Sequence, residues 1–336
     1  MISHPHEALA DEASGPAPIF LEWFNIELAS RCNLRCKWCS LDFDKPSVNM
    51  DEALLGKALD ELLSTGWTIG EIALHNGGEA LMHPRLPAIL DVIASRRSGR
   101  ESFPLISLLT NGVLMNERKA GTLLASGAVD LVRFSVDGGS AAAFEEFRTP
   151  AKWGVVRDNI HRFVKMNNAA PRRVRTGVIC MIAPDQPAEL GWMEEEFRDV
   201  LLAVDSYELR YPHNWDGSKD LGLTPRPQTN VLGVVPLNML RKGRALLHQA
   251  RELVAPRPED HQHPVCKFLQ REMVLLPDGR VSVCCADLNA RGVIGNINDS
   301  SLREVFDSDQ RASMIDAFLR GRKASIPLCK DCAGYY

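Results

Sequence analysis

The stretch SRCNLRCKWCSLDF, residues 30 to 43, sets three cysteines, Cys32, Cys36 and Cys39, directly after a short apolar segment. Deprotonated thiols at this spacing, in the loop that follows a first strand, can bind three irons of a [4Fe–4S] cluster. The fourth iron would then stay open for another ligand, much as a catalytic zinc keeps one position free. A structural zinc site is the alternative, but it usually takes four protein ligands, and no fourth cysteine is close by in the sequence.

The composition of the chain is that of an ordinary globular protein. Of its 336 residues, 45% are hydrophobic and 24% are charged, so the chain can bury a sizeable core. The formal net charge of -4 shows no basic excess, which argues against nucleic acid as a partner. No apolar run reaches the length of about eighteen residues that a membrane span needs, and the start of the chain lacks the pattern of a signal peptide. We therefore expect a cytoplasmic protein without membrane contacts, in which nine cysteines favour metal binding or catalysis over disulfides.

Short β-branched or aromatic runs alternate with amphipathic helical runs over the first two-thirds of the chain. The clearest helix is Met50–Leu63, with Asn49 and Glu52 as its capping pair and Gly66 after its end. Strands that alternate with helices predict an α/β fold of parallel strands, in which sites gather at the carboxyl ends. The expected strands are Trp23–Ala29, Glu71–His75, Leu105–Thr110, Val129–Val136, Val174–Ile182 and Ser206–Tyr211, and the other expected helices are Arg85–Arg97, Glu117–Ser126, Trp153–Asn167 and Ala188–Ala203.

The alternation stops after Tyr211. Residues 212–236 are rich in Pro, Gly, Asn and Asp and predict an irregular segment that can cover a substrate. Two further helical runs are Leu237–Val254 and Ala312–Arg320. A PDG turn between Arg271–Leu276 and Arg280–Cys284 predicts a hairpin. Ser301 with Glu304 is expected to cap a short helix. We therefore divide the chain into an N-terminal tail (1–21), an α/β core (22–236), a linker helix and loop (237–265) and a small α+β domain (266–336).

The small domain contains a second set of cysteines. Cys266 and Cys284 flank the hairpin, and PLCKDC adds Cys329 and Cys332 near the end. Four thiolates close a site, and they suit an iron–sulfur cluster or a tetrahedral zinc ribbon. Cys285, next to Cys284, can be an alternative ligand, a small buried side chain or a spare thiol.

The first cysteine motif resembles the signature of the radical S-adenosylmethionine (SAM) enzymes, in which the amino and carboxylate groups of SAM chelate the open iron. HNGGEA then matches the Gly-Gly-Glu motif of that family, and the resemblance implies that Gly77, Gly78 and Glu79 hold the methionine amino group. Considered alone, the two glycines can also be a simple turn. The resemblance covers about residues 22–211 and implies a partial (β/α)6 TIM-like barrel with a small C-terminal α+β auxiliary-cluster domain.

The resemblance implies further contacts to SAM from the ends of the next strands. These are Thr110 and Asn111 in LLTNG, Ser135 and Asp137 in FSVDG at the ribose or methionyl end, and Val178 and Met181 beside the adenine. The alternatives are a helix cap for Ser135 and Asp137, and a core position for Met181.

The last seventy residues are similar to the Twitch domain, the shortened form of the SPASM domain. This similarity implies one auxiliary [4Fe–4S] cluster on Cys266, Cys284, Cys329 and Cys332, and hence two clusters together with SAM. Because the sequence stops four residues after Cys332, we expect no second auxiliary cluster. An electron donor such as flavodoxin or ferredoxin is the implied protein partner.

The Twitch region is similar to that of the butirosin-pathway dehydrogenases of an amino-cyclitol and related antibiotic-biosynthesis enzymes. The resemblance implies abstraction of hydrogen from a sugar-, cyclitol- or nucleoside-like small molecule and oxidation of a secondary alcohol to a ketone, with the auxiliary cluster as electron acceptor. Decarboxylation of a sugar acid and epimerisation of a sugar carbon are alternatives. Peptide modification is less favoured, since no leader-binding domain precedes the core. A non-catalytic iron–sulfur or zinc-stabilised binding protein is the alternative of another class.

Candidate substrate residues lie where the sixth strand ends, in YELRYPHNWDG. Glu208 and Arg210 share one face of that strand, and His213 follows in the loop. Arg210 can bind a carboxylate or phosphate with two hydrogen bonds, and His213 can accept the proton lost on oxidation. A solvated loop with a surface Arg–Glu pair is the alternative. Cys180, in the fifth strand, is either a core residue or a thiol that returns a hydrogen atom to a substrate radical.

Overall fold

The computed structural model describes residues 19–181, 195–210, 214–222, 231–236 and 265–332. Six parallel strands follow one another in chain order across the sheet, each beside its predecessor. They are β1 (Phe20–Ile26), β2 (Thr68–Leu74), β3 (Leu105–Thr110), β4 (Leu131–Ser135), β5 (Arg175–Met181) and β6 (Ser206–Arg210). All six expected strands are present with bounds shifted by a few residues, and the α/β, partial barrel-like fold is confirmed.

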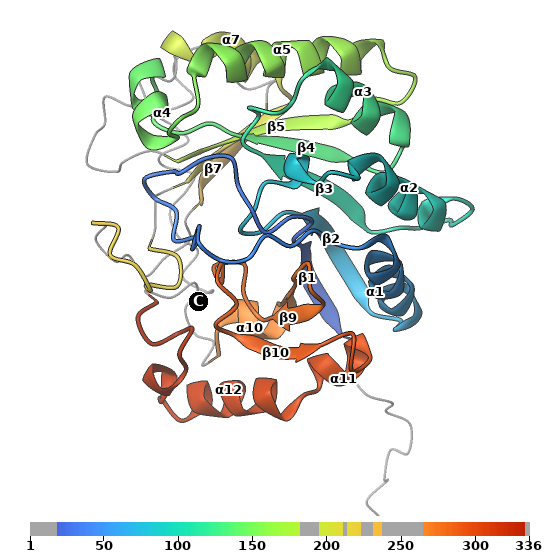
Figure 1. Ribbon diagram of the computed structural model, residues 1–336, viewed down its shortest axis with the longest axis vertical. Helices are drawn as coiled ribbons and strands as arrows, with labels where there is room; N and C mark the ends of the chain where they lie inside the picture. Colours follow the sequence, from blue (N-terminus) through green and yellow to red (C-terminus); the bar gives the residue numbers. More distant parts are fainter. Residues whose placement is uncertain (1–18, 182–194, 211–213, 223–230, 237–264, 333–336) are drawn as a thin grey trace, which may run out of the picture.

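Helices cover the outer side of the curved sheet (Figure 1). They are α1 (Glu52–Ser64), α2 (Leu86–Arg97), α3 (Glu117–Ser126), α4 (Ala141–Phe147), α5 (Trp153–Ala169) and α7 (Arg198–Ala203), with a short 3-10 helix η1 (Ala80–Met82) after β2. The expected helix Ala188–Ala203 is described only from residue 195 onward, and the expected helix Leu237–Val254 lies outside the described residues. None of the helices in the described ranges is long and apolar enough to cross a membrane.

The start of α1 differs from the expected capping pair. Asp51 is the N-cap, because its side chain accepts hydrogen bonds from the backbone N–H groups of Ala53 and Leu54. Asn49 instead forms an isolated bridge with Ala29, beside the first cysteine loop. Gly66, as expected, follows the helix end with a φ of 71°, a conformation that glycine adopts without strain.

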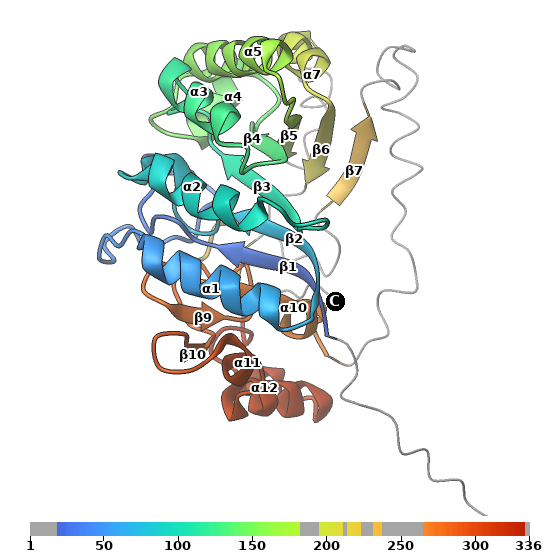
Figure 2. The ribbon, with the colours of Figure 1, turned by 90° about the vertical axis from the view of Figure 1, so that its right-hand side faces the viewer.

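The sheet gains further strands at both edges of the six-stranded part. Strand β7 (Val231–Pro236) pairs antiparallel with β6, so the end of the segment that was expected to be irregular is a strand. At the other edge, β8 (Glu272–Leu275) pairs parallel with β1, which makes the C-terminal part continuous with the barrel sheet. Within the described ranges the sheet has the order β10-β9-β8-β1-β2-β3-β4-β5-β6-β7. Figure 2 shows the C-terminal elements directly beside β1.

The C-terminal region confirms the local signals of its sequence. Strands β8 and β9 (Arg280–Ser282) form the expected hairpin, in which Gly279 has a φ of 90°. Ser301 and Glu304 form the expected capping box at the start of α11. The remaining elements are α10 (Lys267–Arg271), β10 (Val293–Asn296), α11 (Leu302–Phe306), α12 (Asp309–Leu319) and η3 (Lys323–Ser325).

The two faces of the barrel sheet differ in polarity. Phe134 contacts Phe163 of α5 with ring centroids 5.7 Å apart, so its side of the sheet packs against the helices. Side chains alternate along a strand, so the opposite face, here called the lumen face, includes Glu71, Ser107 and Arg133. These three polar residues are joined by hydrogen bonds. A polar surface therefore lies inside the barrel, and the apolar core lies outside it.

Candidate functional site

The three cysteines of the first motif lie in the loop between β1 and α1. Burial raises the pKa of Cys32 to about 11 and that of Cys36 to about 12. Backbone N–H groups counter this effect: the N–H of Leu34 donates to Cys32 Sγ at 3.5 Å, and the N–H of Leu41 lowers the pKa of Cys39. Hydrogen bonds from N–H groups to sulfur stabilise thiolates, which is the form that binds metal.

The three thiols of the first motif are the kind of donor that an iron–sulfur cluster binds. No three His, Cys, Asp or Glu side chains in the described part of the chain are grouped so that they could hold one metal ion. A tetrahedral zinc needs its sulfurs about 2.3 Å from one centre, whereas a [4Fe–4S] cluster binds each thiolate through a different iron. The donor set, three thiols from one loop, therefore fits the iron–sulfur interpretation of the motif.

The Gly-Gly-Glu segment packs directly against the cysteine loop. A Cβ on Gly78 would lie 1.7 Å from the backbone oxygen of Ala29, so no other residue fits there without moving the backbone. The backbone N–H of Glu79 donates to the carbonyl of Arg31 at 2.9 Å. Gly78 is thus required by close contact between two loops and does more than form a turn.

Glu79 connects the second and third strand ends. Its Oε1 accepts a hydrogen bond from Thr110 Oγ1 at 2.8 Å, and its Oε2 accepts one from the N–H of Asn111 at 2.8 Å. Burial raises the pKa of this carboxyl, while these donors and the N–H of Leu81 lower it. Asn111 Nδ2 in turn lies 3.8 Å from Cys32 Sγ. The fold thus brings Glu79, Thr110 and Asn111 together beside the first cysteine.

Asp137 is held by residues of its own chain. Its Oδ1 accepts the N–H of Met181 at 2.9 Å, and its Oδ2 accepts Nε and Nη2 of Arg148 at 2.8 and 2.6 Å. The N-cap of α4 is Ser140, so Asp137 is not a helix cap. Sequence reasoning missed Arg148, which is buried and whose charge lowers the pKa of Cys36 against the effect of burial.

The candidates of β4 and β5 divide between the two faces of the sheet. Val178 is the register partner of Phe134 and therefore faces the helices, as does Cys180 two residues later. Both are buried there, at 1% and 0% exposure, away from the lumen face. Ser135 and Met181 lie on the lumen face. The structure therefore does not bring Val178 and Cys180 to the side where a cofactor or substrate would bind.

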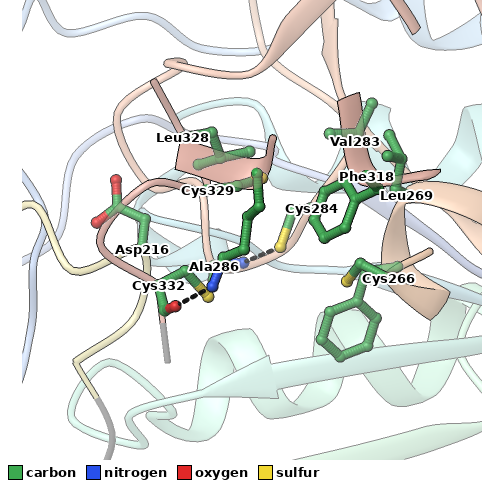
Figure 3. A pocket seen from close by; sticks show the side chains of 12 residues that line it. Asp216, Cys266, Leu269, Val283, Cys284, Ala286, Phe318, Leu328, Cys329 and Cys332 are labelled. Atoms are coloured by element: carbon green, nitrogen blue, oxygen red, sulfur yellow. Dashed lines mark hydrogen bonds between the residues drawn. The ribbon is translucent and has the colours of Figure 1, made fainter. Parts of the chain in front are cut away.

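The four C-terminal cysteines line one cavity (Figure 3). Cys266 precedes α10; burial raises the pKa of its thiol, and the backbone N–H groups of Leu269 and Phe268 lower it. Cys284 Sγ accepts the N–H of Ala286 at 3.4 Å. Cys285 is not among the lining residues. Its thiol interacts first with the Cys284 thiol, and then with Glu272 and the charge of Arg210, which lower its pKa against the effect of burial. The residues that line the cavity are Asp216, Cys266, Phe268, Leu269, Val283, Cys284, Ala286, Phe318, Lys323, Leu328, Cys329 and Cys332.

Residues 214–222 connect the two cysteine sites. Trp215 Nε1 donates to the carbonyl of Trp38 in the first loop at 2.6 Å. Asp216 lines the C-terminal cavity and pairs with Arg291 at 2.8 Å. The expected substrate segment therefore includes a structural connection between the sites. His213, the expected proton acceptor, lies outside the described residues.

Glu27 is a second residue that sequence reasoning missed. It follows β1, is 1% exposed, and its Oε2 accepts hydrogen bonds from the N–H of Gly77 and from Asn76 Nδ2, both at 3.2 Å. Burial raises its pKa, and the nearby Lys45 lowers it. Lys45 also donates to the carbonyl of Leu288 at 2.9 Å, which ties this carboxyl to the C-terminal region. The sequence signal that could have identified Glu27 is a carboxylate directly after an apolar strand.

The polar residues on the lumen face form ion pairs. Arg210 Nε contacts Glu208 Oε1 at 2.6 Å; the carboxylate is 15% exposed and the arginine side chain 38% exposed, so the pair is half-buried. Arg133 pairs with Glu71 at 2.7 Å. His75, beyond β2, has a pKa lowered to about 4 by burial and by the charge of Arg133. Its Nδ1 has no hydrogen-bond partner in the described ranges.

Comparison with known proteins identifies two families along the chain. Residues 26–188 match the Radical SAM superfamily, and residues 266–333 match SPASM, an iron-sulfur cluster-binding domain. A GTP 3',8-cyclase of Parasynechococcus marenigrum is 30% identical over 141 residues, covering 40% of this chain and 38% of the cyclase. The first curated relatives are matched over about half of their length or less.

Two solved structures have the same fold over nearly the whole chain. BtrN in complex with AdoMet and 2-DOIA has a TM-score of 0.56 at 18% identity and covers 94% of both chains. SuiB of Streptococcus suis bound to the precursor peptide SuiA has a TM-score of 0.63 at 14% identity, covering 94% of this chain and 72% of SuiB. At these identities the similarity establishes the fold alone, and the two proteins are bound to different kinds of molecule, 2-DOIA in one and a precursor peptide in the other.

Proposed function

This chain belongs to the radical SAM superfamily, and we propose that it oxidises a secondary alcohol of a sugar- or cyclitol-like small molecule to a ketone. It is a radical SAM enzyme, and its two matched domains imply two [4Fe–4S] clusters and SAM as cofactors. When bound, these groups supply a 5′-deoxyadenosyl radical and an acceptor for one electron. The proposed place of the reaction is antibiotic or secondary-metabolite biosynthesis in the cytoplasm, where a flavodoxin or ferredoxin donates the first electron.

The observation that supports an oxidation is the second cysteine site at the edge of the barrel sheet. Oxidation of an alcohol removes a hydrogen atom, a proton and an electron, so the enzyme needs an electron acceptor near the substrate. The cavity lined by Cys266, Cys284, Cys329 and Cys332 is joined to the barrel by the pairing of β8 with β1. Four thiolates leave no position for a substrate to coordinate, which suits electron transfer.

The residues of the first site have separate proposed tasks. Cys32, Cys36 and Cys39 would hold the cluster and leave one iron open. Gly77, Gly78 and Glu79, with Thr110 and Asn111, would position SAM beside that iron, because the structure gathers these residues against the cysteine loop. Ser135 and Met181 would contact SAM from the lumen face.

The lumen face would bind the substrate. Its alternating carboxylates, guanidiniums and hydroxyl offer donors and acceptors, which a polyhydroxylated molecule requires. Glu208 fixes the orientation of Arg210, so this guanidinium can present its remaining N–H groups in a defined direction. His213 remains the proposed acceptor of the hydroxyl proton.

The test is anaerobic reconstitution followed by turnover. We expect about eight irons per chain for two four-iron clusters, and 5′-deoxyadenosine when a reductant and SAM are added with a panel of sugars and cyclitols. A product lighter by two hydrogens supports oxidation. Release of carbon dioxide would instead select decarboxylation, and solvent deuterium in a product without other mass change would select epimerisation. Binding of zinc in place of iron would contradict the proposed radical reaction.

A further inference from the structure

A backbone contact places Arg148, at the end of α4, opposite the middle cysteine of the first motif. The N–H groups of the two residues that flank Cys36 donate to the carbonyls of the two residues that flank Arg148, at 2.7 and 2.8 Å. Cys36 and Arg148 therefore lie opposite each other, as paired residues do in two adjacent strands. The rings of Trp38 and Phe147, with centroids 4.2 Å apart, pack beside this contact.

Arg148 is buried, and its charge is paired with one carboxylate. The residue is 6% exposed, and its Nε and Nη2 lie 2.8 and 2.6 Å from Oδ2 of Asp137. The other oxygen of Asp137 accepts the N–H of Met181 at 2.9 Å, which fixes the carboxylate at the ends of β4 and β5. Burial raises the pKa of Cys36, and the charge of Arg148 lowers it by more than the charge of Asp137 raises it. The positive charge of the pair is thus the one that dominates at the thiol.

The same guanidinium acts on the whole motif. Burial raises the pKa of all three thiols, Cys32, Cys36 and Cys39, and the charge of Arg148 lowers each of them. Further charged side chains that shift one of these pKa values are Glu79, Asp137, Lys45 and Lys219. Arg148 is therefore a buried positive charge that is shared by the three thiols.

Such a charge has a consequence for a cluster on these thiolates. Reduction adds one negative charge to the cluster, and a fixed positive charge nearby stabilises the reduced state. In a buried site the surroundings screen this interaction weakly. Nearby net charge is one of the factors that set the reduction potential of an iron–sulfur cluster.

We propose that the buried guanidinium of Arg148 raises the reduction potential of the first cluster, so that a one-electron donor protein can reduce it, and that Asp137 moderates this effect. The inference needs a cluster on the first cysteine motif, but it does not depend on the proposed oxidation of an alcohol. Arg148 would act on the cluster through its charge and would not be one of its ligands. The alternative is an ion pair that only holds the loop in place.

The test is a redox titration of the full-length holoenzyme without SAM or substrate, followed by electron paramagnetic resonance. In a separate sample, the signal that changes when SAM is added identifies the first cluster. Arg148→Gln keeps an N–H donor for Asp137 but removes the charge, so reduction of the first cluster should become about tenfold less favourable, a downward shift of about 59 mV. Arg148→Lys keeps the charge and should change this equilibrium by about threefold or less. Asp137→Asn should shift the potential upward.

The control removes the same charge at an exposed position of the same loop. Lys37 is next to Cys36, but its side chain is 53% exposed, so solvent screens its charge. Lys37→Gln should change the reduction equilibrium by about twofold or less. In every variant the second cluster, whose ligands belong to the C-terminal region, is the internal reference and should shift less than the first.

The signs of the shifts decide between the two interpretations. If the ion pair only holds the loop, Arg148→Gln and Asp137→Asn both loosen the site and should move the potential in the same direction, whereas opposite shifts support the charge effect. An unchanged or higher potential in Arg148→Gln overturns the inference. If that variant binds no first cluster, Asp137→Asn decides, and the absence of an upward shift then overturns it. Failure of every sugar and cyclitol as a substrate would contradict the proposed function and leave these potentials unaffected.

Discussion

The two cysteine sites are built in opposite ways. The first takes Cys32, Cys36 and Cys39 from one loop, so its ligands are neighbours in sequence. The second takes Cys266, Cys284, Cys329 and Cys332 from segments that only the folded chain brings together. The first site is supported from outside by Gly78, Asn111 and Arg148, which come from three other elements. The second is enclosed mainly by apolar side chains of the C-terminal region, together with Lys323 and with Asp216 from residues 214–222.

This difference suggests a division of tasks. A local motif of three thiolates keeps one metal position open, and the surrounding strand ends can shape that opening. A closed set of four thiolates depends on the whole C-terminal fold and offers no position to a substrate. The connection between the sites runs through residues 214–222 and through the pairing of β8 with β1. Damage to the first site should therefore stop radical formation, and damage to the second should leave it.

The largest expected effect comes from Cys36→Ala. Loss of one of three ligands should reduce the iron content from about eight to about four per chain and abolish formation of 5′-deoxyadenosine. Iron and sulfide analysis with chromatography of the nucleoside products measures both. Cys180→Ala is the matched control, since Cys180 is buried on the helix-facing side, and it should retain both clusters. Wild-type nucleoside formation by Cys36→Ala would contradict the open-site interpretation.

Cys329→Ala should separate the two sites. We expect loss of the second cluster with cleavage of SAM largely retained, because the first loop is untouched. Substrate oxidation should fall by about tenfold or more, since the proposed electron acceptor is gone. The measurement is the ratio of oxidised product to 5′-deoxyadenosine over several turnovers. Unchanged oxidation over many turnovers would show that the second site is not an electron acceptor.

Gly78→Ala should disrupt the packing of the Gly-Gly-Glu segment against the first cysteine loop. The added Cβ would lie 1.7 Å from the backbone oxygen of Ala29, so one of the two loops must move, at a cost of about 1–3 kcal/mol or more. Denaturation should show lower stability, and titration should show weaker SAM binding. Gly154→Ala in α5 is the control, because a Cβ there would meet nothing within 4 Å beyond its chain neighbours and the helix's own backbone. Equal stability of the two variants would mean that the loop contact tolerates a methyl group.

The same contrast explains what the sequence could predict. The three-cysteine loop, the hairpin and the capping box of Ser301 are local, so spacing alone indicated them correctly. The pairing of β8 with β1 joins residues that are far apart in sequence, and no local pattern specifies it. Arg148 and Arg291 carried no signal either, because a single arginine in a polar segment usually faces solvent.

Alternation along β5 was a signal that could have been used. Side chains three residues apart on a strand point to opposite faces, so Val178 and Met181 cannot both line one adenine pocket. The structure places Met181 on the lumen face and Val178 with the helices. A prediction of pocket residues from family motifs must therefore also agree with the alternation of side chains between the two faces of a strand.

The smallest expected effect compares two helix caps. Ser301→Ala removes the cap of α11 in the C-terminal region, and Asp51→Ala removes the cap of α1 beside the first site. Each should cost about 1 kcal/mol of stability. If the closed site depends on the surrounding fold, only Ser301→Ala should speed the loss of iron from the second cluster to a chelator, by roughly fivefold. Spectroscopic monitoring of both clusters during chelation measures these rates. If the second cluster loses iron at equal rates in the two variants, the stability of the four-cysteine site does not depend on the fold around it.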